Sequence, residues 1–219
     1  MALARAGAAG QIELIESVPL LGGTFSAQLI PQIAGLLEKN GLTKNQIDGF
    51  MVASGPGSFT GLRVGLSAIK ALAEILQKPI VPVSLLEVVA RAAGVDGHVL
   101  AVLDAGRRQL YSGEYEISGV RARLIQEQLI SRHALAGLSS RIAISTPDPS
   151  LALMSREAGL RTFEVKAVCP EMIATLGYSK LQEGETASPE QLDANYVRRS
   201  EEIFGNPSSP SPQSSVSRP

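Results

Sequence analysis

The sequence predicts an α/β protein, with room in its 219 residues for one large domain or two lobes of roughly 100 residues each. Two observations support this class. A short apolar segment at 50–53 leads into a glycine-rich loop and a long helical pattern at 59–77, as a buried strand followed by a helix would. Farther along, three strand-like segments at 99–128 are joined by short turns and are followed by two strand-and-helix units.

The first half of the chain should form a first lobe, residues 1–96. Thr24 or Ser26 is suited to begin its first helix, Gly41 to end that helix, and Pro79 follows the end of the long one. The expected elements are a hairpin at 1–16, helices at 24–40, 59–77 and 85–93, and strands at 50–53 and 80–83.

The second half should form a second lobe, residues 97–204, because turn residues cluster at 94–97. Residues 205–219 are rich in serine and proline and have few apolar side chains to offset the entropy of ordering, so a disordered tail is predicted there. The expected elements of the second lobe are strands at 99–103, 109–117, 121–128 and 141–145, and helices at 150–158 and 170–183.

The long helix at 59–77 carries more apolar surface than its own core requires. Its polar residues form one narrow stripe of roughly 80°, which leaves an apolar arc of roughly 220°. An ordinary surface helix needs an arc of only about 100° or somewhat more. Small residues lie on one side of this arc, so a second helix could approach there, although burial between two layers of the same domain is an equally good interpretation. The stripe consists of Arg63, Ser67, Lys70, Glu74 and Gln77.

The loop before this helix is a weak candidate for phosphate binding. Free N–H groups at a helix start can bind anions, and Gly55, Gly57, Ser58 and Thr60 would form the cradle. The glycine spacing misses the dinucleotide fingerprint by one residue, and no Walker A lysine follows. A purely structural turn, with Ser58 or Thr60 as the helix cap, is the favoured interpretation.

Composition narrows the class of protein. The net charge is −1 and the isoelectric point is near 6.2, so the chain has no basic field to drive tight binding of nucleic acid by itself. Its single cysteine, Cys169, excludes an internal disulfide and fits a reducing cytoplasm. No apolar run reaches the roughly 20 residues of a membrane span, so we expect a soluble cytoplasmic protein.

Catalytic side chains are sparse. The two histidines, His98 and His133, are far apart and belong to no metal-binding pattern. Asp104 follows a strand, where it could lie near a phosphate and magnesium, but a turn residue that accepts local backbone hydrogen bonds is the favoured interpretation. The Arg107–Arg108 and Arg198–Arg199 pairs are interpreted as solvated surface charges, and the second pair could also reach a partner protein.

Three stretches resemble the bacterial TsaB (YeaZ) family, whose members are the dimerisation subunit of the complex that makes threonylcarbamoyladenosine at position 37 of tRNA. The most specific stretch is Ser54-Gly55-Pro56-Gly57-Ser58-Phe59-Thr60-Gly61-Leu62-Arg63-Val64-Gly65-Leu66. The two supporting stretches are 103–111, which is similar to a hairpin of the second lobe, and 192–199, which is similar to a C-terminal motif. The resemblance runs from about residue 1 to about residue 200.

This resemblance implies a two-lobed fold related to actin, Hsp70 and sugar kinases, of the ribonuclease H-like type. It also implies a non-catalytic scaffold that binds a larger TsaD-type catalytic subunit, with a TsaE-type ATPase subunit docking on the pair. Under this interpretation the chain needs no cofactor of its own, ATP and metal belong to the partner subunits, and tRNA is contacted only through the complex. A homodimer through the same surface is the alternative when the TsaD-type partner is absent.

The apolar arc of the long helix is the surface that such pairing would use. The predicted contact residues on it are Gly61, Gly65, Ala68 and Leu72, assisted by Leu29, Ile33 and Leu36 of the first helix. Self-pairing through one helical surface would be two-fold symmetric and largely apolar at its centre.

One departure from the family concerns the first lobe. Members of the family begin with an apolar strand that ends in Asp-Thr-Ser, whereas this sequence begins within what would be their second strand, at Ala2-Leu3-Ala4. The missing strand would lie centrally, between the hairpin and the strand at 50–53. Its absence predicts unpaired backbone groups and an exposed edge of the core.

Two other classes of protein fit the sequence less well. An actin-like ATPase or small-metabolite kinase is disfavoured because the Asp-Thr-Ser strand is absent and the phosphate loop is poor. A metalloprotease of the glycoprotease type is disfavoured because no histidine pair is available on a helix.

Overall fold

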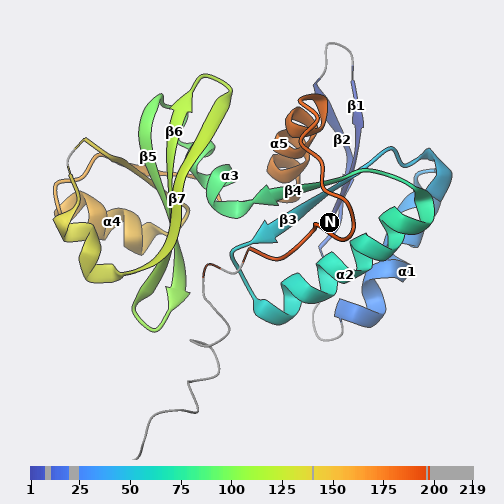
Figure 1. Ribbon diagram of the computed structural model, residues 1–219, viewed down its shortest axis with the longest axis horizontal. Helices are drawn as coiled ribbons and strands as arrows, with labels where there is room; N and C mark the ends of the chain where they lie inside the picture. The colour runs from blue at the N-terminus through green and yellow to red at the C-terminus, as the bar shows by residue number, and fades with distance from the viewer. Residues whose placement is uncertain (8–10, 20–24, 140, 196, 198–219) are drawn as a thin grey trace, which may run out of the picture.

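In the computed structural model the chain forms two lobes with helix α3 (Leu85–Ala92) between them (Figure 1). The structure describes residues 1–7, 11–19, 25–139, 141–195 and 197. Each lobe combines strands with covering helices, so the predicted two-lobed α/β class is confirmed. Within the described ranges, no helix is both long enough and apolar enough to cross a membrane.

The first lobe holds two separate two-stranded sheets. Strand β1 (Ala2–Ala6) pairs antiparallel with β2 (Ile12–Ser17), and β3 (Phe50–Gly55) pairs parallel with β4 (Ile80–Ser84). Among the described residues, no strand pairing joins the hairpin to β3 and β4. Among these residues each pair therefore keeps an unpaired edge, as predicted from the sequence.

Helices cover both faces of the β3–β4 pair. Alternate residues of a strand point to opposite faces, and accordingly Phe50 and Val52 pack with α2 (Phe59–Leu76), whereas Met51 packs with α5 (Pro170–Gln182). Helix α5 also contacts β1 and β2, so it spans both small sheets of the lobe. It lies so close to β3 that a Cβ atom built on Gly177 would stand 2.3 Å from Cγ of Met51.

The remaining helix of the lobe, α1 (Phe25–Lys39), contacts α2 and covers the hairpin. Its residues Leu36 and Leu37 form a buried cluster with Leu3 of β1. A short 3-10 helix, η2 (Lys44–Gln46), connects α1 to β3. The side chains of Thr24 and Ser26, the expected caps of α1, lie outside the described residues.

The second lobe is built on one five-stranded sheet with the order β7-β6-β5-β8-β9. The three long strands β5, β6 and β7 are antiparallel neighbours, whereas β8 and β9 run parallel to β5. Helix α3 packs on one face of this sheet, and α4 with the 3-10 helix η3 packs on the other. The bounds are β5 (Gly97–Gly106), β6 (Gln109–Ser118), β7 (Arg121–Ser131), η3 (Arg132–Gly137), β8 (Ala143–Thr146), α4 (Pro149–Glu157) and β9 (Thr162–Glu164).

Side-chain caps place several helix starts where the sequence predicts them. The Ser58 hydroxyl accepts a hydrogen bond from the Gly61 N–H at 3.3 Å and begins α2, and the Ser84 hydroxyl does the same for the Glu87 N–H at 3.4 Å at the start of α3. Helix α2 ends at Leu76 and is followed by Gln77, whose φ of 52° is left-handed.

The chain differs from expectation in how its last third is shared between the lobes. The boundary expected near 94–97 coincides with the start of β5, but α5, assigned from sequence to the second lobe, packs against the sheets of the first. Leu192 and Ala194 likewise belong to a buried cluster of the first lobe. Strand β9 was not anticipated because three residues carry too little periodicity to be recognised. Residues 205–219, the expected tail, lie outside the described residues.

Candidate partner-binding surface

Helix α2 has one face in the core of the first lobe. Leu66 and Ala73 are buried there, and Leu62 and Ile69 pack beside them against Ile80 of β4. This inner row is the part of the predicted apolar arc that serves the lobe itself. It is the row along which the helix contacts its own sheet.

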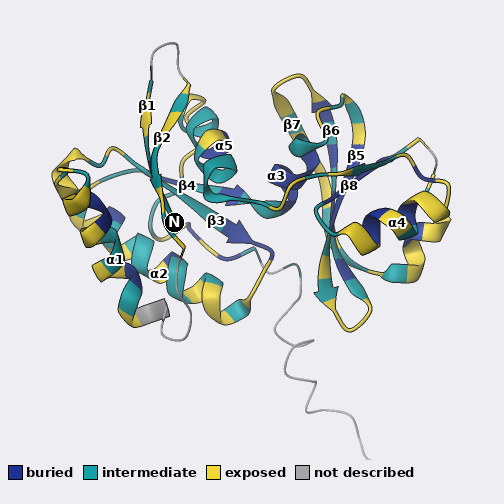
Figure 2. Cartoon of the chain, turned by 180° about the vertical axis from the view of Figure 1, so that it is seen from behind, coloured by how far each residue is buried: buried dark blue, intermediate teal, exposed yellow. Residues whose placement is uncertain are grey.

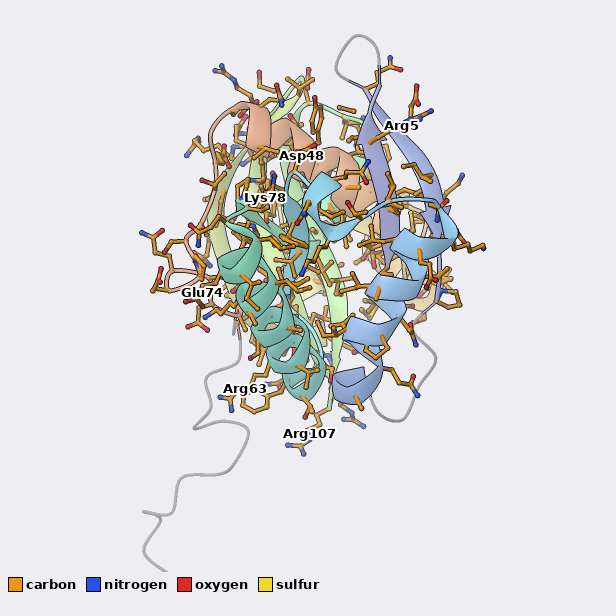
Figure 3. The ribbon with its side chains drawn as sticks, turned by 90° about the vertical axis from the view of Figure 1, so that its right-hand side faces the viewer. Arg5, Asp48, Arg63, Glu74, Lys78 and Arg107 are labelled. Carbon is orange, nitrogen blue, oxygen red and sulfur yellow. The ribbon has the colours of Figure 1, made fainter. Side chains whose placement is uncertain are left out.

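The polar stripe lies where the periodicity predicts it. Arg63, Ser67, Glu74 and Gln77 are exposed, and Lys70 is half-buried. Figure 3 looks onto the face formed by α1 and α2, and in this view Arg63 and Glu74 lie on the side of α2 away from α1. The Arg63 guanidinium stands 3.9 Å from the centre of the Phe59 ring. The stripe therefore borders the apolar face of α2 on one side.

Between the stripe and the core, α2 presents small and apolar side chains to the outside. Gly61 is exposed, and Gly65, Ala68 and Leu72 are half-buried, so all four residues of the predicted contact are accessible. A Cβ atom built on Gly65 would meet no atom within 4 Å, which leaves open space above the helix backbone. Ile75 continues this row and is 72% exposed, whereas Leu72 is half-buried.

Helix α1 does not expose the residues predicted to assist the partner contact. Leu29 and Leu36 are each only 8% exposed, and half-buried Ile33 packs with Leu36 against β1, so these residues face the interior of their own lobe. The reason is that α1 must cover the hairpin, and its leucine-rich row is the one that does so. Among the described side chains of α1, the large apolar one that is exposed is Ile30, at 41%. Figure 2 shows exposed residues along the outer sides of both helices.

Neither Ile30 nor Ile75 is among the contact residues predicted from the sequence. Both lie within apolar patterns that the sequence displays, but periodicity does not say which edge of an apolar arc meets the core and which meets solvent. We use the name α2 face for Gly61, Gly65, Ala68, Leu72 and Ile75 from here on.

The glycine loop is held by the protein's own groups. Gly55 has a φ of +122°, and a Cβ atom there would lie 3.0 Å from the carbonyl oxygen of Asn195. The Ser58 hydroxyl is engaged in capping the Gly61 N–H, while Gly57 and Thr60 are exposed. Because the first glycine is covered and one of the helix-start N–H groups is already satisfied, this geometry supports the structural role of the loop over the phosphate cradle.

Asp104 has the local role favoured from the sequence. Its carboxylate accepts a hydrogen bond from the Gly106 N–H at 3.1 Å and pairs with the Arg132 guanidinium at 3.1 Å. Arg107 and Arg108 form the β5–β6 turn with φ of 51° and 61°, and Arg198–Arg199 lie outside the described residues. Within the described part of the chain, no group of three His, Cys, Asp or Glu side chains could hold a metal ion.

Comparisons with known proteins agree on one family. A family model described as TsaD, tRNA N6-adenosine threonylcarbamoyltransferase, matches residues 21–176. The tRNA threonylcarbamoyladenosine biosynthesis protein TsaB of Bacillus subtilis (strain 168) is 32% identical over 117 residues, which cover 52% of this chain and 51% of that protein. The chain thus spans about half the length of this relative. The TsaB protein of Escherichia coli (strain K12) is 26% identical over 78% of this chain and 79% of its own length.

Solved structures show the same fold. YeaZ from Pseudomonas aeruginosa aligns with a TM-score of 0.66 over 88% of this chain and 93% of the other, at 23% sequence identity. At this identity the likeness concerns the architecture alone. It extends over both lobes described above.

Proposed function

The chain belongs to the family of the tRNA N6-adenosine threonylcarbamoyltransferase (TsaD) model and groups with its TsaB (YeaZ) members, and from this premise we propose that it acts in the synthesis of N6-threonylcarbamoyladenosine at position 37 of tRNA. Its role there is that of a non-catalytic scaffold that binds a TsaD-type catalytic subunit. The α2 face is the surface that makes this contact.

The observation that carries the proposal is the accessible small and apolar row on α2. A 72% exposed isoleucine near the end of α2, in the same row as Gly61 and Gly65, is costly to leave in water, and the small residues allow another helix backbone to approach closely. A helix from a partner packed along this row would bury Ile75 and Leu72 and fill the open space above Gly65. Ile30 of α1 would extend the same contact.

The other proposed partners are those that the family resemblance implies. A TsaE-type ATPase subunit docks on the pair, and tRNA is contacted through the complex, because a net charge of −1 gives this chain no basic field of its own. A second copy of the chain competes for the α2 face when the TsaD-type subunit is absent. Such a homodimer would be two-fold symmetric, with the α2 face of one copy against that of the other.

A non-catalytic role is supported by what the candidate reactive groups do. Ser58 caps α2, and Asp104 bonds to Gly106 and Arg132, so both are engaged in local structure. We expect the purified chain to show no transferase, protease or appreciable ATPase turnover. Turnover that is lost in Asp104→Ala or Ser58→Ala would contradict a scaffold role.

The partner contact can be tested with single substitutions on α2. Ala68→Arg and Gly65→Glu each place bulk and charge in the middle of the α2 face, where a partner would have to bury them. We expect the affinity for a TsaD-type subunit, measured by calorimetry, to fall by about 100-fold or more, or about 2.8 kcal/mol. Homodimerisation, measured by light scattering, should be lost in the same variants.

Ser67→Arg is the matched control, because it adds the same side chain to the exposed polar stripe of the same helix. It should bind as the parent does. Circular dichroism should show all three variants folded, since Leu66, Ile69 and Ala73 on the core side are unchanged. Binding that is unaffected by Ala68→Arg and Gly65→Glu would refute the α2 face as the contact.

A further inference from the structure

Residues 192–195, at the end of the last continuous described range, return to the junction of the two lobes. We call residues 192–195 the strap. Leu192 is 1% exposed and Ala194 is 9% exposed, and both pack with Leu66 and Ile80 in the core of the first lobe. The strap is therefore anchored in the first lobe by apolar burial at two of its four residues.

Asn195, at the end of the strap, bonds to both lobes. Its backbone N–H donates to the Ser54 carbonyl oxygen at 2.7 Å, at the end of β3. Its side-chain amide donates to the Glu127 carboxylate on β7 of the second lobe. Its carbonyl oxygen also covers Gly55, where a Cβ atom would approach to 3.0 Å. One residue thus fixes the start of the glycine loop and connects it to the opposite lobe.

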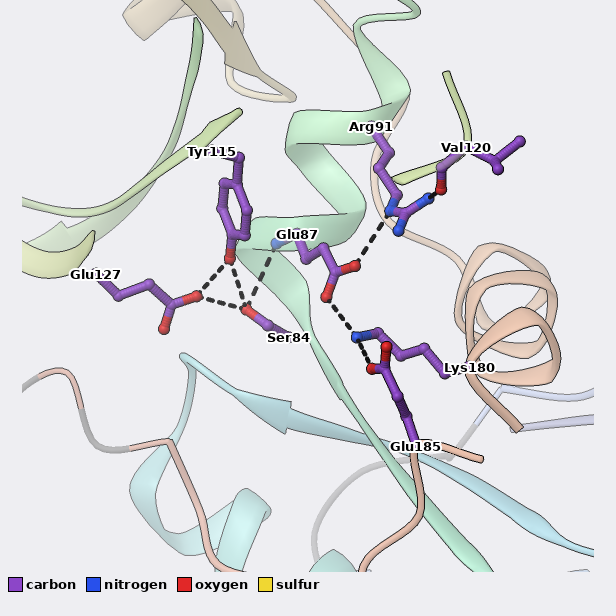
Figure 4. Close-up of polar contacts among 8 residues, drawn as sticks. All are labelled: Ser84, Glu87, Arg91, Tyr115, Val120, Glu127, Lys180 and Glu185. Carbon is purple, nitrogen blue, oxygen red and sulfur yellow. Dashed lines mark hydrogen bonds and ion pairs between the residues drawn. The ribbon is translucent and has the colours of Figure 1, made fainter. Parts of the chain in front are cut away.

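The Glu127 side chain is held in place for this contact (Figure 4). Its carboxylate accepts hydrogen bonds from the Ser84 hydroxyl at 2.8 Å and from the Tyr115 hydroxyl at 2.5 Å. Burial, followed by the nearby Glu127 charge, raises the pKa of Tyr115 far above its usual value, so the phenol remains a proton donor. Ser84 in turn caps α3, so the position of Glu127 is tied to the segment that connects the lobes.

We propose that the strap is a latch that sets the angle between the lobes and holds the glycine loop ahead of α2. Domains joined by short connections move relative to each other unless a substantial interface prevents it. The bond from Asn195 to Glu127 joins the lobes next to Ser84, where the chain passes from β4 into α3. Breaking it releases the lobes and, through Ser54 and Gly55, loosens the loop at 55–58.

Asn195→Asp tests the latch with little change of shape. It replaces the amide donor by a second carboxylate facing Glu127, while the backbone N–H can still reach Ser54. Asn195→Ala removes the donor without adding charge. Asp193→Asn is the matched control, because Asp193 is an exposed member of the same strap and its carboxylate accepts a hydrogen bond from the Ala194 N–H at 2.7 Å.

The angle between the lobes can be followed through the distance between two spin labels, one on each lobe of the full chain, measured by pulsed electron spin resonance. Exposed Glu74 on α2 and exposed Ser118 at the end of β6 are suitable cysteine sites once Cys169 is replaced by alanine. We expect a broader and shifted distance distribution in Asn195→Asp and Asn195→Ala, and the parent distribution in Asp193→Asn.

Amide hydrogen exchange of residues 54–60 provides the second measurement. It should rise by about tenfold in both Asn195 variants, with exchange in β5 and β6 unchanged. Leu192→Ala cuts the other anchor of the strap and should have the same two effects. Unchanged distances and loop exchange in both Asn195 variants would overturn the proposal. It would also fail if only Leu192→Ala had an effect, since the bond to Glu127 would then not be the latch.

Discussion

A methyl group added at Gly177 should destabilise the first lobe. A Cβ atom there would lie 2.3 Å from Cγ of Met51, 2.7 Å from Cβ of Met51 and 3.3 Å from a methyl carbon of Val83. Because the second contact involves a Cβ atom, a rotation of the Met51 side chain cannot relieve it, and α5 must move away from β3. Overpacking of this kind costs up to about 3 kcal/mol. The alanine regains about 1 kcal/mol in helix propensity, so the net loss should be about 2 kcal/mol.

Urea unfolding of Gly177→Ala, followed by circular dichroism, measures this loss. Gly35→Ala on α1 is the matched control, because Gly35 is exposed and a Cβ atom there would meet nothing within 4 Å. The same substitution should therefore stabilise the chain at position 35, by about 0.5 to 1 kcal/mol, and destabilise it at position 177. Adding Met51→Ala removes the 2.3 Å contact and should reduce the cost of Gly177→Ala by about 1 kcal/mol in a double-mutant cycle. A Gly177→Ala protein as stable as its parent would refute the close approach of α5 to β3.

Three further predictions concern other parts of the chain. An apolar strand ending in Asp-Thr-Ser, fused ahead of Met1, should pair the open edges of the two small sheets. The free energy of unfolding should then rise by several kcal/mol, on the order of one hydrogen-bonded core strand. Equal stability with and without this strand would mean that residues 1–17 are misaligned with the family. Deletion of residues 205–219 should leave the melting temperature and partner binding unchanged, since this segment has almost no apolar area to bury, and a clear drop would show that it docks. Asp148→Ala should cost about 1 kcal/mol at neutral pH by removing the cap of α4. Desolvation raises the pKa of Asp148, but hydrogen bonds from Ser150 and Leu151 outweigh this effect, so the pKa is lowered overall. The stability that the cap contributes should therefore disappear as the pH falls through the lowered pKa. If Asp148→Ala were equally destabilising in acid, the ionised Asp148 carboxylate would not be the cap of α4.

The sequence by itself determined the elements whose signals are local. The strand, glycine loop and helix around Gly55 follow from an apolar run, backbone-breaking residues and a serine cap, and the structure has them at Phe50–Gly55 and Phe59–Leu76. The polar stripe of α2 follows from the helical period alone. Unpaired edges in the first lobe were predicted by comparison with a family pattern, and the described residues show no pairing between the hairpin and β3 or β4.

Only the tertiary structure decided which apolar surfaces meet. Periodicity marks an apolar row but does not identify what covers it, so Leu29 and Leu36 were expected at a partner and instead lie within their own lobe. Helix α5 and Leu192 return to the first lobe after the chain has built the second, and no local signal encodes such a return. The bond between Asn195 and Glu127 joins residues 68 positions apart, and its formation depends on how the two lobes pack and on the chain between them.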